Sequence, residues 1–118
     1  MVVDDALQGV SDVVRGADLL DSTPWQIALQ RTLSLPTPTY THLPLMIEST
    51  GAKLAKSRHS VALDPKAAGR QLHQALSILR QEPPATLELE PVATVLQWAL
   101  AHWRPERFRG VREVPVGP

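Results

Sequence analysis

Hydrophobic and polar positions along the chain change character near residue 64. Before that point, short apolar runs bounded by turn residues favour strands. The first run, SDVVRGADLL, predicts a short buried strand through Val13 and Val14 that ends at Arg15-Gly16. The run THLPLMIE predicts another strand, EST-Gly51 a turn, and AKLAK a returning arm or the loop beyond it.

A helix is predicted between these two strands. Thr23 suits its N-cap, Pro24 its first helical position, and Gln26 is placed to close a capping box. The apolar positions that follow fit helical spacing only loosely, and Pro36 and Pro38 stop the helix.

The pattern after residue 60 is helical. Asp64 as N-cap and Pro65 as first helical residue predict a helix that lasts until the Pro83-Pro84 break. A second helix starts near Pro91 and ends before Pro105, and the two are expected to form an antiparallel pair. One face of the second helix should carry Val92, Val95, Leu96, Ala99, Leu100 and Trp103. The final VREVPVGP predicts no regular structure.

Composition narrows the function classes. The 118 residues suit one domain, with 43% hydrophobic content and a formal net charge of zero. The sequence lacks cysteine, which excludes disulfides and thiolate metal sites within it. His59, His73 and His102 share no ligand spacing, so no metal site is expected, and His42 is expected to be structural. Neither a leader pattern nor a membrane-length apolar stretch is evident, so we expect a cytoplasmic protein.

The stretch GAKLAKSRHS offers candidate phosphate chemistry. Two lysines, Lys53 and Lys56, follow a glycine and can both reach one polyphosphate, where they would stabilise charge as pyrophosphate departs. The alternative is a solvated turn, because surface turns commonly carry lysines. Arg15 also has two interpretations. It either binds a ligand carboxylate at the carboxyl end of a strand or simply pairs with a neighbouring acid, namely Asp12, Asp18 or Asp21.

The order and spacing of VVRGADLLDSTP and of HLPL followed by KLAKS make the chain recognisable. From Val2 to about residue 64, and more loosely to Trp103, it resembles the second half of the catalytic domain of class I glutamyl-type aminoacyl-tRNA synthetases. Within that family it is most similar to the short bacterial branch that joins glutamate to the queuosine of tRNA(Asp), the glutamyl-Q tRNA(Asp) synthetases.

The resemblance implies a fold and a set of partners. It implies an α/β fold: the C-terminal half of a Rossmann-type catalytic domain at 1–63, a small helical subdomain at 64–104 and a tail at 105–118. It implies an ATP-dependent ligase whose partners are ATP with Mg²⁺, L-glutamate and tRNA(Asp), and it implies no membrane. The zinc of the family would be held by an upstream insert whose ligands are absent from this chain.

The resemblance also assigns residues. Lys53-Leu54-Ala55-Lys56-Ser57 is similar to the K-M-S-K-S signature, in which Lys53 and Lys56 act in catalysis and Lys56 and Ser57 bind ATP. Arg15 matches the arginine that holds glutamate, and Asp18 an acidic position near ATP. Ala55 departs from the usual serine, so weakened phosphate contact is expected.

The H-I-G-H motif and the first glutamate-binding residues of the family lie upstream of the resemblance. The resemblance also implies that the chain begins inside a strand. We therefore expect the 118 residues to be inactive by themselves, with the missing half either in frame upstream of Met1 or on a separate N-terminal polypeptide. Two alternatives stay open at this point. The chain is part of a glutamyl-tRNA synthetase, or it is a non-catalytic remnant that binds tRNA or protein.

Overall fold

The computed structural model describes residues 1–47 and 63–115, and they fall into two compact units, Met1–Leu45 and Met46–Pro118. The lysine motif at 53–57, the turn at EST-Gly51 and the returning arm lie outside the described residues. The domain boundary at residue 63 stays a prediction.

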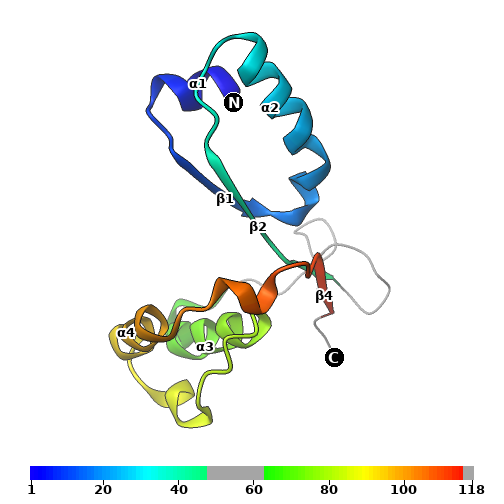
Figure 1. Ribbon diagram of the computed structural model, residues 1–118. Coiled ribbons are helices and arrows are strands. Elements are labelled where there is room, and N and C mark those ends of the chain that lie inside the picture. The colour runs from blue at the N-terminus through cyan, green and yellow to red at the C-terminus, as the bar shows by residue number, and fades with distance from the viewer. Residues whose placement is uncertain (48–62, 116–118) are drawn as a thin grey trace. The chain divides into compact units, whose positions relative to one another are not determined.

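The first unit is built around a βαβ arrangement (Figure 1). Strand β1 (Asp12–Gly16) leads through a 3₁₀ turn (Ala17–Ser22) into helix α2 (Thr23–Thr32), and the chain returns as β2 (Thr39–Leu43). The strands are parallel, with Val13 opposite Tyr40 and Arg15 opposite His42. Parallel strands need a crossover of this kind, and α2 supplies it. Helices with a parallel strand pair agree with the α/β fold expected from the sequence.

One face of the strand pair is joined to α2 by side chains. The Gln30 amide lies 2.7 Å from the Tyr40 hydroxyl, and the Thr23 hydroxyl lies 2.9 Å from His42 Nε2. Val14 points to the other face because side chains alternate along a strand, and it is 63% exposed. The β1 strand is therefore confirmed, but the burial predicted for Val14 is wrong.

Two predictions about helix starts need correction. The chain begins with helix α1 (Val2–Leu7) and not within a strand, and Asp4 and Asp5 in its first turn favour the helix through its dipole. Helix α2 is present, but Ser22 is its N-cap and no side chain caps it. The predicted capping box is absent, since Gln26 is hydrogen-bonded to the Met1 sulfur at 3.4 Å.

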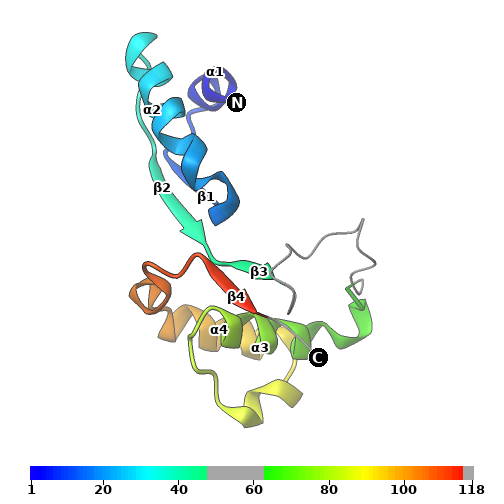
Figure 2. The same cartoon turned by 90° about the vertical axis from the view of Figure 1, so that its right-hand side faces the viewer.

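The predicted strand THLPLMIE is two strands. Pro44 lacks an amide hydrogen for a ladder, so β2 ends at Leu43 and a separate strand, β3 (Leu45–Ile47), follows. This second strand pairs with β4 (Glu113–Pro115), which Figure 2 shows beside it. The prediction of no regular structure in VREVPVGP is therefore wrong for residues 113–115.

The second unit is mainly helical (Figure 2). The Asp64 carboxylate accepts a hydrogen bond from the Lys66 amide at 2.9 Å, so the predicted cap is confirmed. It caps a 3₁₀ turn (Pro65–Ala67) that leads into helix α3 (Ala68–Ile78). A 3₁₀ segment (Ala85–Leu89), helix α4 (Val92–His102) and a last 3₁₀ turn (Pro105–Phe108) follow.

The core of this unit contains Leu76, Leu87 and Val95, with Leu72, Trp98 and Ala99 packed against it. The face predicted for α4 is only partly right. Val95 is fully buried, whereas Leu100 is 83% exposed and Leu96 46%. Trp98 takes the inward position because its large ring covers the core from one turn further along.

None of the helices in the described ranges, 1–47 and 63–115, is long and apolar enough to cross a membrane.

Candidate functional site

Arg15 is the centre of the most connected polar group in the first unit. Its NH2 donates to the Thr23 hydroxyl at 2.6 Å, and its Nε donates to His42 Nε2 at 3.4 Å. Its NH1 lies 3.6 Å from the Met1 sulfur, and the guanidinium carbon lies 5.0 Å from the centroid of the Tyr40 ring. We call Arg15, Thr23, Tyr40 and His42 the Arg15 cluster.

Local structure explains why these residues meet. Arg15 and His42 face each other in the parallel register near the carboxyl ends of β1 and β2. Tyr40 lies two residues before His42 on the same face, and their rings are parallel to within 10° at 6.1 Å. Thr23 is the first residue of α2 and is buried, so the start of the helix places its hydroxyl against both strands.

The cluster favours the neutral form of His42. Burial lowers the pKa of His42, and the positive charge of Arg15 lowers it further. An arginine Nε can only donate a hydrogen bond, so Nε2 of His42 must be the acceptor and the proton of the neutral ring must lie on Nδ1. Thr23 and His42 thus contact the Arg15 guanidinium as neutral groups.

A second polar contact continues the cluster along α2. Gln30 is buried and its amide nitrogen contacts the Tyr40 hydroxyl, while its Oε1 is buried without a hydrogen-bond partner among the described residues. Since a buried hydrogen bond fixes both side chains, Gln30 holds the Tyr40 ring in place beneath the guanidinium.

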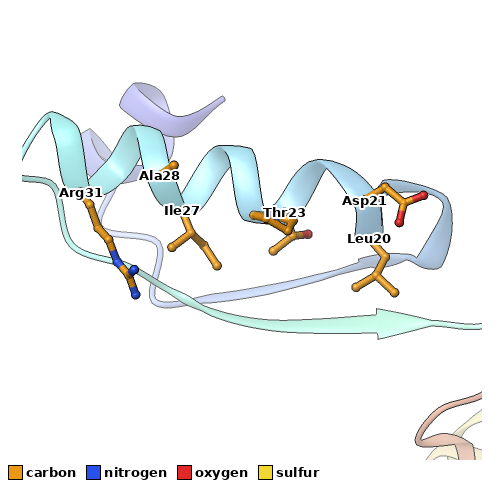
Figure 3. A pocket seen from close by; sticks show the side chains of 7 residues that line it. Leu20, Asp21, Thr23, Ile27, Ala28 and Arg31 are labelled. Carbon is orange, nitrogen blue, oxygen red and sulfur yellow. The ribbon is translucent and has the colours of Figure 1, made fainter.

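An open pocket of about 610 Å³ adjoins the cluster through Thr23 (Figure 3). It is lined by the end of the 3₁₀ turn and by α2, with Leu20 and Ile27 giving it an apolar wall. Asp21 lies toward one end and Arg31 toward the other, as Figure 3 shows. Apolar walls with a few charged groups are typical of small-molecule sites.

Asp18 is held close to the strand end. A Cβ added at Gly16 would lie 2.6 Å from Asp18 Oδ1, so the carboxylate packs directly over the glycine. Asp18 therefore lies just beyond the end of β1, against Gly16. The roles of Arg15 and Asp18 toward glutamate and ATP stay predictions.

The other site predictions concern the lysine motif, an ion pair of Arg15 and a metal site. Lys53, Lys56 and Ser57 lie outside the described residues, so their relation to Arg15 stays a prediction. The alternative of an ion pair between Arg15 and Asp12 is not supported, because that carboxylate accepts hydrogen bonds from Ser11 and Thr39 at the opposite end of β1. In the described part of the chain, no group of three or more His, Asp or Glu side chains could hold a metal ion.

Comparison with known proteins identifies the family. The family model for the catalytic domain of class I tRNA synthetases, types E and Q, matches residues 1–79. The chain belongs to this class I tRNA synthetase family. The match covers the whole βαβ unit and the Arg15 cluster, so both belong to a synthetase catalytic domain.

Three curated relatives of this class I synthetase chain carry the same name. A glutamyl-Q tRNA(Asp) synthetase of Xanthomonas axonopodis pv. citri is 52% identical over 116 residues, which is 98% of this chain and 39% of the relative. One of Ectopseudomonas mendocina is 52% identical over 108 residues, 92% of the chain and 37% of the relative. One of Pseudomonas aeruginosa is 45% identical over 115 residues, 98% of the chain and 39% of the relative. The chain therefore spans less than two fifths of the length of these ligases.

Sequence reasoning missed Thr23 as a partner of Arg15 and interpreted it as a helix cap. The available clue was its spacing of eight residues from Arg15, which a strand, one short turn and a helix start can bring back together. His42 contacts Arg15 and Thr23, and its expected structural role stays a prediction.

Proposed function

We propose that this chain is part of a ligase that activates glutamate with ATP and transfers it to the queuosine of tRNA(Asp). The names of the relatives support this substrate pair. The observation that carries the proposal is the Arg15 cluster, in which a cation at the carboxyl end of a parallel strand is fixed by neutral groups. In open α/β sheets ligands bind at such strand ends, and an arginine fork suits a carboxylate.

In the proposed reaction, a carboxylate oxygen of glutamate attacks the α-phosphorus of ATP and pyrophosphate leaves. Arg15 holds the amino acid, and Lys53 and Lys56 stabilise the negative charge that develops on the phosphates. Asp18 and Ser57 contact ATP, and Mg²⁺ accompanies the nucleotide. A hydroxyl of the tRNA base then attacks the acyl carbon of this mixed anhydride, so that a glutamyl ester forms and AMP leaves.

We further propose the arrangement within the whole enzyme. Residues 1–63 form the C-terminal half of a Rossmann-type catalytic domain, 64–104 a helical subdomain and 105–118 a tail. The remaining ATP contacts and the zinc-binding insert belong to an upstream half, and the enzyme works in the cytoplasm. The share of the relatives that this chain spans supports the need for more protein.

The test uses a completed enzyme, in which the upstream part of the Xanthomonas axonopodis relative precedes these 118 residues. Glutamate-dependent exchange of pyrophosphate into ATP is measured for Arg15→Lys and Lys56→Ala, with Arg70→Lys and Lys66→Ala as controls at exposed positions of the second unit. We expect Arg15→Lys to raise the KM for glutamate and Lys56→Ala to lower kcat, each by at least about tenfold, while both controls match the parent. Unchanged kinetics in both site variants would refute the proposal.

The matched family model covers both glutamate and glutamine enzymes, so it does not distinguish this function from that of a glutamyl-tRNA synthetase. The tRNA that the enzyme charges does distinguish them. We expect the completed enzyme to glutamylate queuosine-containing tRNA(Asp) and not tRNA(Glu). Charging of tRNA(Glu) alone would favour the ordinary synthetase.

A further inference from the structure

The three nitrogen atoms of the Arg15 guanidinium have different partners. Nε and NH2 are held by His42 and Thr23, both of them partly or fully shielded from solvent. NH1 is directed at the sulfur of Met1, a residue that is 65% exposed. A thioether is a weak acceptor, so a carboxylate oxygen would replace it readily at this nitrogen.

The Thr23 hydroxyl and His42 Nε2, which both contact Arg15, also lie beside each other. Thr23 Oγ1 accepts from Arg15 NH2, so its own proton is free to be donated, either to His42 Nε2 at 2.9 Å or to the Leu19 carbonyl at 3.2 Å. His42 Nε2 accepts from Arg15 and also lies within reach of the Thr23 hydroxyl. When the Thr23 proton is donated to His42, the three side chains form a closed ring of hydrogen bonds. When it is donated to the Leu19 carbonyl, Thr23 and His42 still hold two different nitrogens of Arg15.

We propose that Thr23 and His42 are positioning residues that fix Arg15 so that NH1 is presented to the carboxylate of glutamate. This inference rests on the proposed role of Arg15 in binding glutamate. Neither residue touches the substrate, and both act through the orientation of the guanidinium. An arginine has several rotatable bonds, and holding it before the ligand arrives removes the entropy cost of ordering it on binding.

Thr23 offers a matched pair of variants. Thr23→Val keeps the branched shape but removes the hydroxyl, whereas Thr23→Ser keeps the hydroxyl and loses a methyl group. Both fit the buried space, in which Thr23 is 7% exposed. At His42, Gln retains an acceptor oxygen and Leu has none, so His42→Gln and His42→Leu form a second pair that does not depend on the first.

The first measurement is made on the 118-residue chain without substrate. Nitrogen NMR reports the tautomer of His42 and the solvent exchange of the Arg15 Nε proton. We expect an unprotonated Nε2 at neutral pH. We also expect exchange to be about tenfold faster in Thr23→Val and His42→Leu than in the parent, as for loss of one hydrogen bond, and little changed in Thr23→Ser and His42→Gln. A proton on Nε2, or equal exchange in all variants, would overturn the proposal.

The second measurement is the glutamate KM of the completed enzyme. We expect Thr23→Val to raise it about tenfold with little change in the KM for ATP, and Thr23→Ser to restore it. Arg15→Lys distinguishes the positioning role of Thr23 from the role of Arg15 in binding glutamate. If it raises the glutamate KM and Thr23→Val does not, the positioning role fails and the proposed function stands. If Arg15→Lys has no effect, the assigned role of Arg15 fails, and the inference fails with it.

Discussion

Replacing Gly16 by alanine tests how the end of β1 is built. The new Cβ would lie 2.6 Å from Asp18 Oδ1 and 3.3 Å from Leu45 Cδ2. The first distance is too short, so the Asp18 carboxylate must turn away, whereas the leucine needs to yield by only a few tenths of an ångström. The backbone angles of Gly16, φ −68° and ψ 152°, are ordinary for alanine.

The cost of moving Asp18 and the stabilising effect of replacing a glycine nearly cancel in the free energy of unfolding. Turning Asp18 out of its rotamer costs about 0.5–1.5 kcal/mol. Alanine has less conformational freedom than glycine in the unfolded chain, which raises the free energy of unfolding by about 0.4–1 kcal/mol. We therefore expect the free energy of unfolding of the first unit to change by less than about 1 kcal/mol. The displaced carboxylate should instead raise the KM for ATP in the completed enzyme and leave the KM for glutamate unchanged.

The stability assay is urea unfolding of the isotope-labelled chain, followed at the amide signals of β1 and β2. Gly9→Ala is the contrasting variant, because Gly9 has open space around it but a φ of +70°. It should cost about 1–2 kcal/mol through backbone strain alone. A Gly16→Ala loss above about 3 kcal/mol would show that the contacts cannot relax. A raised glutamate KM would show that Asp18 does not act on ATP separately from Arg15.

Three further predictions concern the helical unit, the cluster and the chain as a whole. Val95→Ala should lower the free energy of unfolding of the second unit by about 2 kcal/mol in urea unfolding, because Val95 is fully buried. Leu100→Ala, at a side chain that is 83% exposed, should change it by less than about 0.5 kcal/mol. Equal losses in the two variants would contradict the described core. The pKa of His42 in the folded chain is below its ordinary value of 6.5, so the unfolded chain binds the proton more readily. The stability of the first unit should therefore fall as the pH drops below about 6.5, and level off below the pKa of the folded chain. Urea unfolding at several pH values checks this, and a stability that rises on acidification through that range would contradict it. The 118 residues alone should give no glutamate-dependent pyrophosphate exchange, and clear turnover would show that they need no upstream half.

The sequence predicted the elements that carry the site. A polar entry, two valines and a glycine are typical of a strand, and Thr-Pro before a loose apolar pattern is typical of a helix start, so β1 and α2 were expected where they lie. Arg15 was placed at the end of its strand by the same reasoning.

The helix ends could not be predicted in the same way. Two residues beyond the last residue of helices α1, α2 and α3 the chain adopts a positive φ, at Gly9, Ser34 and Arg80 respectively. After α2, for example, the Leu35 amide bonds the Gln30 carbonyl at 2.8 Å, which closes the turn. Only the first of the three is a glycine. The serine and the arginine adopt this conformation because of the chain around them, and their own preferences give little warning.

Tertiary contacts also explain why Thr23 was misinterpreted. Its preference for a cap is a local property, whereas its role in the structure depends on Arg15, eight residues earlier, and His42, nineteen residues later. The strand β4 was missed for a related reason. Three residues near the end of the chain form a strand only because β3 offers them a partner.

Arg15 is proposed to hold glutamate, and Lys56 to stabilise the pyrophosphate that departs. Calorimetric binding of a non-hydrolysable glutamyl-adenylate analogue to the completed enzyme tests the role of Arg15 most directly. We expect Arg15→Lys to weaken binding by at least about tenfold, Lys56→Ala to weaken it less because the analogue carries no pyrophosphate, and the glutaminyl analogue to bind more weakly than the glutamyl one. Equal affinity of the parent and Arg15→Lys for the glutamyl analogue would contradict the account.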